Sequence, residues 1–257
     1  MSDSPILLAG DIHGDENWLF NFLVPKAKEV GCDRIIALGD FGMFWDNASN
    51  PKRVSDRIER LGLELWFLDG NHENFGMMYE HGFDPDVIPG TIPVRNDDFG
   101  GLAYLPRGST FEWGGNTIMA FGGAFSIDKD RRVEGLSWWR DELITEGQVR
   151  RVEDNPVKVD ILLSHDVAGT PPVLRHYLDH GHQIPYKLDQ QSKQNREMLR
   201  RVFDVVQPSW NFHGHYHYAY QDRLDMCTFK GLACNGMEGA YIILRDDRTD
   251  EQNQEQA

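Results

Sequence analysis

The chain has 257 residues, of which 40% are hydrophobic and 11% aromatic, enough to bury a sizeable core and to exclude a disordered chain. Its formal net charge of −15, from 41 acidic and 26 basic residues, argues against extended nucleic acid as a partner because an acidic surface repels polyanions. Cys32, Cys227 and Cys234 form no CxxC pair. This sparse, odd count argues against a disulfide framework and for a reducing compartment.

The start of the chain, Ser2-Asp3-Ser4-Pro5, lacks the basic and apolar stretches of a signal peptide. No run approaches the roughly 20 apolar residues that span a bilayer. We therefore expect a cytoplasmic protein without membrane contact. We find no repeat and no dividing linker, and expect one domain over residues 1–245 and a frayed acidic tail over residues 246–257. The oligomeric state stays open.

Strands and helices alternate in the first third of the predicted structure. Apolar residues recur at helical spacing over residues 19–30 and 54–61, and Gly31 and Gly62 follow as helix stops. The repeated β-α-β order predicts parallel strands with right-handed crossovers. The strands are predicted at Ile6–Ala9, Arg34–Leu38 and Leu65–Leu68.

The rest of the chain has a different pattern. Short β-like runs broken by glycine lie between residues 101 and 121, helical spacing returns over residues 138–152, and a strand is predicted at Asp160–Leu163. Residues 167–189 are rich in Pro, Gly and His, and we expect a long loop there, whose role as a lid stays open. A helix then carries Leu199, Val202, Phe203 and Val206, and the last quarter is β-like.

Five short polar blocks occur in order, and most follow a predicted strand. In open α/β sheets, ligands bind beyond the carboxyl ends of the strands, so these side chains can converge. Asp, Asn and His supply the oxygen and nitrogen donors that bind divalent cations. The blocks are Gly10-Asp11-Ile12-His13-Gly14, Gly39-Asp40, Gly70-Asn71-His72-Glu73, Ser164-His165-Asp166 and Gly214-His215-Tyr216-His217.

As an ordered set, the blocks resemble the signature of the calcineurin-like metallophosphoesterase superfamily: D-x-H, G-D, G-N-H-[DE], a lone His and G-H-x-H. The resemblance covers nearly the whole chain. It implies an α/β fold in which two packed mixed β-sheets are flanked by helices. It also implies a first metal held by Asp11, His13 and His217, a second held by Asn71, His165 and His215, and Asp40 as the bridge between them.

The implied activity is hydrolysis of a phosphoester by a hydroxide that bridges two divalent cations. The mixed donor set suits Mn²⁺, Fe or Zn²⁺ better than Mg²⁺, and we favour Mn²⁺. By the same resemblance, His72 contacts the phosphate and protonates the leaving oxygen. Glu73 and Asp166 are expected to hold metal-bound histidines in place, and His213 to pack beside the ligands.

The second block departs from the protein Ser/Thr phosphatase branch, which continues it as G-D-x-x-D-R-G with an Arg that grips the phosphate. Here Phe41-Gly42-Met43-Phe44-Trp45-Asp46 follows, and that Arg is absent. Phe44 and Trp45 are candidates for stacking on a nucleobase, with core packing as the alternative. The candidate replacements for the missing grip are Arg107, Arg131 and Arg132.

With fewer fixed cations, the site suits a diester with one charge as well as a monoester with two. We favour a phosphodiesterase acting on small nucleotides such as cyclic nucleotides. The alternatives are a phosphomonoesterase or protein phosphatase, a metal-dependent nuclease, and a catalytically silent binding scaffold. The charge of −15 argues against the nuclease, and the presence of all seven ligand residues argues against the scaffold.

Overall fold

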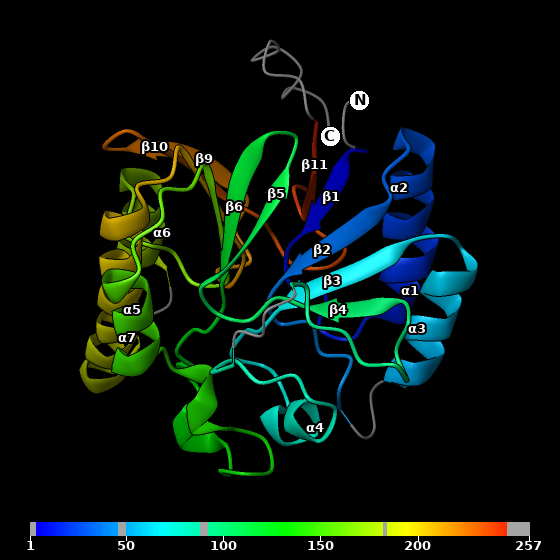
Figure 1. Cartoon of the computed structure of the whole chain (residues 1–257). Helices are drawn as coiled ribbons and strands as arrows, with labels where there is room; N and C mark the ends of the chain where they lie inside the picture. Colours follow the sequence, from blue (N-terminus) through cyan, green and yellow to red (C-terminus); the bar gives the residue numbers. More distant parts are fainter. Residues whose placement is uncertain (1–3, 46–49, 88–91, 182–183, 246–257) are drawn as a thin grey trace.

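The computed structural model describes residues 4–45, 50–87, 92–181 and 184–245. The predicted tail over residues 246–257 lies outside this part of the chain. Within it, two mixed β-sheets face each other and helices cover their outer sides (Figure 1). The predicted α/β fold of two packed sheets flanked by helices is therefore confirmed. None of the described helices is both long and apolar enough to cross a bilayer.

Within the described residues, the first sheet has five strands in the order β11-β1-β2-β3-β4. β1 to β4 run parallel, as the β-α-β pattern predicted, whereas β11 pairs antiparallel with β1. The first described strand therefore lies inside the sheet. The bounds are β1 Ile6–Ala9, β2 Arg34–Leu38, β3 Glu64–Leu68, β4 Leu102–Tyr104 and β11 Tyr241–Leu244.

In the part of the chain that the structure describes, the second sheet has six strands in the order β5-β6-β7-β8-β10-β9. Its central strands β6, β7, β8 and β10 are parallel, and the edge strands β5 and β9 pair antiparallel with β6 and β10. The bounds are β5 Ser109–Trp113, β6 Asn116–Phe121, β7 Ile161–Ser164, β8 Trp210–His213, β9 Tyr220–Leu224 and β10 Cys227–Gly231.

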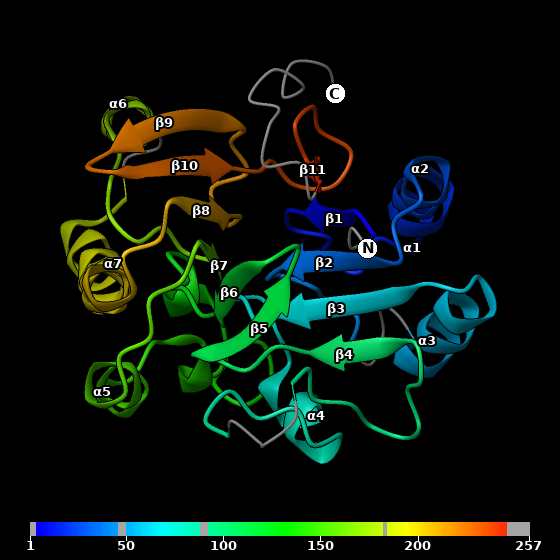
Figure 2. The ribbon, with the colours of Figure 1, turned by 45° about the horizontal axis from the view of Figure 1, so that its top comes forward.

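The helices fall into two groups, one on each side of the pair of sheets (Figure 2). On the side of the first sheet are α1 Glu16–Trp18, the π-helical turn η1 Leu19–Leu23, α2 Val24–Val30 and α3 Pro51–Arg60, while α4 Phe75–Glu80 follows β3. On the other side are α5 Glu146–Asp154, α6 Pro172–His180 and α7 Tyr186–Val206. Two short 3-10 turns are η2 Lys129–Arg131 and η3 Arg140–Glu142.

Alternation along the strands builds the layered core. In β1, Ile6 and Leu8 face the second sheet, whereas Leu7 and Ala9 face the helices. Period two sends successive side chains to opposite faces, and both faces here are covered, so all four residues are buried. The apolar runs that looked continuous in the sequence are therefore strands buried on both sides.

Two element predictions were wrong in part. Residues 167–189 are not one long loop, because α6 occupies Pro172–His180 and α7 begins at Tyr186. Pro172 suits the first turn of a helix, and Leu174 and Leu178 follow at a spacing of four on one face. The helix expected over residues 138–152 begins only at Glu146, because Thr145 and Gln148 form a capping box there.

Arg107 lies in the interior, which contradicts its predicted contact with substrate. Its guanidinium forms an ion pair with Asp69, 2.5 Å from Oδ2, and both side chains are fully buried. Arg107 also donates to the carbonyl oxygens of Asp141 and Leu143, and Tyr104 donates its hydroxyl to Asp69. Since Asp69 directly follows β3, this buried pair holds the start of the loop that carries Asn71 and His72.

Arg107→Ala should lower the free energy of unfolding by about 3–5 kcal/mol, because it leaves the carboxylate of Asp69 buried and unpaired. Urea denaturation measures this change. Arg150→Ala is the matched control: its ion pair with Glu146 lies on the surface of α5, where solvent screens it, so the loss of stability should be much smaller. Equal losses in the two variants would contradict the role assigned to the buried pair.

Candidate metal centre

The predicted metal ligands come together where the carboxyl ends of the two sheets meet. Asp11, Asp40 and Asn71 follow β1, β2 and β3 of the first sheet. His165 follows β7, and the His215–His217 loop follows β8, both in the second sheet. The two sheets thus contribute to one place, which neither could build alone.

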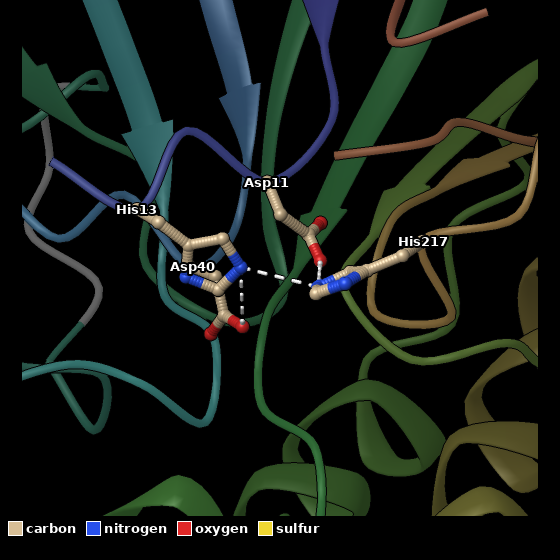
Figure 3. Close-up of side chains that lie close together, drawn as sticks. All are labelled: Asp11, His13, Asp40 and His217. Atoms are coloured by element: carbon tan, nitrogen blue, oxygen red, sulfur yellow. Dashed lines mark hydrogen bonds and ion pairs between the residues drawn. The ribbon is translucent and has the colours of Figure 1, made fainter. Parts of the chain in front are cut away.

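Four of these side chains form a tight cluster (Figure 3). In Asp11, His13, Asp40 and His217, one donor atom of each lies within 4.8 Å of the others. Nε2 of His217 lies 3.0 Å from Oδ2 of Asp11 and 3.1 Å from Nε2 of His13. Two imidazole nitrogens that face each other can share at most one proton. A cation between these donors would satisfy both nitrogens as well as the carboxylates.

Of the remaining predicted ligands, His165 and Asn71 lie beside Oδ1 of Asp40, and His215 packs against the ring of His165. Nε2 of His165 is 3.0 Å from Oδ1 of Asn71 and 3.3 Å from Oδ1 of Asp40. The ring centroids of His165 and His215 are 5.1 Å apart. The Nδ1 atom of His165 lies 2.7 Å from the carbonyl oxygen of Leu38, so a hydrogen bond there leaves Nε2 as the nitrogen that faces the cluster.

Asp40 occupies the position between the two groups. Its Oδ2 lies 4.0 Å from Nε2 of His13, while its Oδ1 faces His165 and accepts the backbone N–H of His72. Burial alone would raise the pKa of Asp40, but His165, His72 and His13 outweigh it and hold that pKa well below the usual range. The side chain is therefore a buried carboxylate ion that touches both groups.

The histidines differ in their affinity for protons. Burial would lower the pKa of His165, but Asp40 and Asp11 outweigh it and raise that pKa to about 10. A hydrogen bond to Asp11 raises the pKa of His217, whereas burial lowers the pKa of His215 to about 4. In the absence of a cation, the excess negative charge of the carboxylates is thus balanced by protons on some of the histidines.

The strand ends approach so closely that glycine is required beside the ligands. A Cβ atom on Gly39 would lie 2.2 Å from Nδ1 of His165, and one on Gly214 would lie 2.1 Å from Oδ1 of Asp11. Four predicted ligands adopt positive φ angles, an uncommon conformation for any residue other than glycine. They are His13 at 51°, Asp40 at 43°, His215 at 70° and His217 at 51°.

Of the arginines suggested as a phosphate grip, Arg132 contacts His72, which lies beside the cluster. Its Nη2 lies 2.6 Å from Nδ1 of His72, while its Nε donates to Asp128 over 2.9 Å. Arg131, its neighbour, is exposed at the end of η2. Burial lowers the pKa of His72 against the opposing effect of Asp40, and Arg132 lowers it further. His72 is therefore a neutral imidazole beside a guanidinium.

The two aromatic residues suggested for stacking have different positions. Phe44 is fully buried among Phe41, Phe67 and Phe83, so the expectation that it stacks on a nucleobase is wrong and core packing holds. Trp45 is half-buried; its Nε1 donates to the carbonyl oxygen of His72 over 3.0 Å, and its ring meets Trp139 edge-on. Trp45 thus stays beside the cluster.

The polar residues next to the predicted ligands form hydrogen bonds to backbone N–H groups and to side chains of neighbouring elements. Glu73 accepts the N–H groups of Phe41 and Gly42, which fixes the loop that carries Asp40 rather than a histidine ring. Asp166 accepts hydrogen bonds from Tyr216 and Asn195. His213 is fully buried, and its Nε2 lies 2.6 Å from the hydroxyl oxygen of Tyr220.

Ser126 contacts the predicted ligand Asn71, although nothing in the sequence singled it out. Its Oγ accepts the side-chain amide of Asn71 over 3.1 Å and donates to Glu142 over 2.6 Å. This bond turns the oxygen of the Asn71 amide toward His165. The signal was weak: Ser126 follows β6 after Gly122-Gly123-Ala124-Phe125, so it lies beyond a strand end as the other site residues do.

Comparison with solved structures finds distant likenesses to this fold. They include the Thermus thermophilus protein TT1561, with 13% identity, a TM-score of 0.49, and coverage of 91% of this chain and 90% of that one. A putative 5'-nucleotidase from Staphylococcus aureus has 13% identity and a TM-score of 0.49, with coverage of 95% of this chain and 51% of that one. Phosphopantetheinyl hydrolase from Mycobacterium tuberculosis has 14% identity and a TM-score of 0.48, covering 98% of both chains. No curated protein sequence matches the chain.

The family comparison takes in the elements from β1 to β8. The sequence profile described as calcineurin-like phosphoesterase matches residues 4–219, a range that includes every predicted ligand from Asp11 to His217. The chain belongs to the calcineurin-like phosphoesterase family.

Proposed function

We propose that this protein hydrolyses small nucleotide-type phosphodiesters, such as cyclic nucleotides, at a centre of two divalent cations, with Mn²⁺ favoured. The observation that carries the proposal is the position of Asp40, whose two oxygens face His13 on one side and His165 on the other. A carboxylate whose two oxygens face two groups of donors would hold a cation in each group. Membership of the phosphoesterase family supports the same reaction class.

The side chains present fit such a centre. Asp11, His13 and His217 would hold the first cation, and Asn71, His165 and His215 the second. The set mixes carboxylate, amide and imidazole donors, which suits Mn²⁺, Fe or Zn²⁺. When bound, two divalent cations supply Lewis-acid stabilisation of phosphoryl oxygens and a water of lowered pKa.

His72 and Arg132 are the groups of this chain that would handle the substrate itself. Arg132 is anchored by Asp128, and its Nη2 points at His72, so a phosphoryl oxygen placed there would accept from the guanidinium. To protonate the leaving oxygen, the ring of His72 would act as an imidazolium, a form that the negative charges of Asp40 and of a bound phosphoryl group favour. Asp40 accepts the backbone N–H of His72 and so fixes its position.

The positive charge beside His72 supports a phosphodiester substrate. Within the described residues, one arginine, Arg132, contacts His72, and its single positive charge matches the single negative charge of a phosphodiester. A phosphomonoester dianion carries a second negative charge, which the cations alone would have to balance. Trp45, held at the carbonyl of His72, supplies an aromatic surface beside the same place for the rest of the substrate.

Metal-stripped protein reconstituted with Mn²⁺ should cleave bis-p-nitrophenyl phosphate faster than p-nitrophenyl phosphate. Release of nitrophenolate with and without Mn²⁺ measures both rates. Asp40→Ala should abolish both, because it removes the carboxylate between the two groups of ligands, whereas Asp56→Ala on the surface of α3 should not. Faster monoester cleavage would instead favour a phosphomonoesterase.

His72→Ala should retain its bound Mn²⁺ but lower kcat by about 100-fold or more for diesters with poor leaving groups, the range typical of lost general-acid catalysis. For a p-nitrophenolate leaving group, which departs without a proton, the loss should be much smaller. A series of diesters with leaving groups of rising pKa, assayed beside a metal analysis of each sample, makes the comparison. An equal loss across the series would rule out the acid role.

Mn²⁺ affinity should fall as the pH falls. With its pKa raised to about 10, His165 holds a proton at neutral pH in metal-free protein, and a cation binds only the neutral ring. His215, with a pKa lowered to about 4, is already neutral and adds nothing near pH 7. His217, whose pKa is also raised, adds to the release. Calorimetric titration in buffers of different ionisation heats should show at least one proton released, and binding that weakens by at least about tenfold per unit of pH. Affinity independent of pH would contradict this.

A further inference from the structure

A second concave site lies between α6 and α7, outside the predicted ligand set. Its volume is about 590 Å³, within the size range of small-molecule pockets. The turn at Gly169 and Thr170 and the facing sides of the two helices line it. Figures 1 and 2 show these helices together on the outer side of the second sheet. Nothing in the proposed reaction uses this pocket.

Arg196 is the buried charge of the pocket. Its side chain lies on α7 and is only 7% exposed, although it lines the cavity. Its Nη1 donates to the hydroxyls of Ser192 over 2.7 Å and Tyr216 over 3.4 Å. Throughout residues 4–45, 50–87, 92–181 and 184–245, no carboxylate oxygen lies within 4.0 Å of its nitrogens. Its charge is balanced only at a distance, by the buried Asp166 through the hydroxyl of Tyr216 and by Asp189. A buried guanidinium normally has an anion in direct contact, because desolvation of the charge is costly.

The other charges of the pocket lie at its exposed rim and limit what can bind. Lys193 is paired with Asp189 over 2.7 Å, and Arg200 with Asp204 and Asp225. Arg175 is exposed, as are the acidic Asp179 and Glu197. A rim of mixed sign does not attract a long polyanion but leaves room for one anionic group, which would find at Arg196 a guanidinium without a carboxylate in direct contact.

We propose that this pocket binds a small molecule through one oxyanion group, a phosphate or a carboxylate, that pairs with the guanidinium of Arg196. Arginine presents planar N–H donors that match both groups, and charge-assisted hydrogen bonds in a partly enclosed pocket are strong. Leu178 and Ile184 offer apolar surface for the rest of the molecule. The proposal does not depend on the phosphodiesterase activity.

Tyr216 connects this pocket to the candidate metal centre. Its hydroxyl accepts from Arg196 and donates to Asp166 over 2.6 Å. Tyr216 stands between His215 and His217, and its ring meets that of His215 edge-on with centroids 4.9 Å apart. An anion at Arg196 would therefore lie beside the loop that carries two predicted ligands, close enough for a bound molecule to hold that loop in place.

Crystals of the full chain soaked separately in selenate and in 4-bromobenzoate test the proposal. Selenate represents phosphate, and bromobenzoate represents a carboxylate with an apolar body. Anomalous diffraction locates selenium or bromine. We expect a peak within hydrogen-bonding reach of Arg196 from one probe or both, and the probe that binds identifies the oxyanion. The peak should be lost in Arg196→Gln and weakened in Arg175→Gln, which changes only the exposed rim.

Arg150→Gln, on the surface of α5, is the matched control and should keep the peak. If Arg196→Gln fails to fold, weakening of the peak in Arg175→Gln carries the comparison. The proposal is overturned if neither probe gives a peak at Arg196 in the unaltered protein, or if the peak is equally strong without the guanidinium. Because the readout is a bound atom rather than turnover, the result is separate from any failure of the diesterase proposal.

Discussion

The close approach of strand ends from two sheets is the constraint on which this site depends. The loops after β1, β2, β7 and β8 meet at distances that leave no room for a side chain at Gly39 or Gly214. The glycine that precedes Asp40 and the one that precedes His215 are therefore packing requirements. They allow ligands to gather from positions far apart in the sequence, and the sandwich core behind them fixes the spacing.

The same crowding explains the unusual backbone of the ligands. Positive φ at His13, Asp40, His215 and His217 costs about 1–3 kcal/mol at each residue, a cost met by the layered apolar core around the strands. Buried carboxylates add to this cost unless they are paired. The site is thus held by the fold in a conformation that its own local sequence would not choose, which is a form of preorganisation.

The sequence predicted those parts that arise from local patterns. Strands β1, β2 and β7, the helix stop at Gly31 and the ordered polar blocks follow from apolar runs and turn residues, and the structure has them close to the predicted bounds. The division into two sheets came from family resemblance alone, because pairings such as β1 with β11 join segments with no common local signal. The position of Arg132 at His72 could not be predicted, since the segment between β6 and α5 has little regular structure.

Predictions about single side chains failed where burial decided the outcome. Phe44, with core packing as its alternative, and Arg107 are candidates for substrate contact by residue type, yet an aromatic ring also suits a core and a guanidinium also suits a buried carboxylate. Only the three-dimensional neighbours distinguish these cases. By contrast, the ordered set of Asp, Asn and His residues is recognised by its spacing and order, which can be seen in the sequence without knowledge of packing.

The position of β1 inside its sheet has a consequence for biosynthesis. β1 can pair with β2 early, but its other edge is covered only by β11, which is synthesised much later. Asp11 likewise meets His215 across 204 residues of chain. A nascent chain therefore leaves Asp11 without His215 and His217 until the loop after β8 has been made, and leaves one edge of β1 uncovered until β11 has been made. During that interval, the uncovered edge presents unpaired backbone N–H and C=O groups that can pair with another chain.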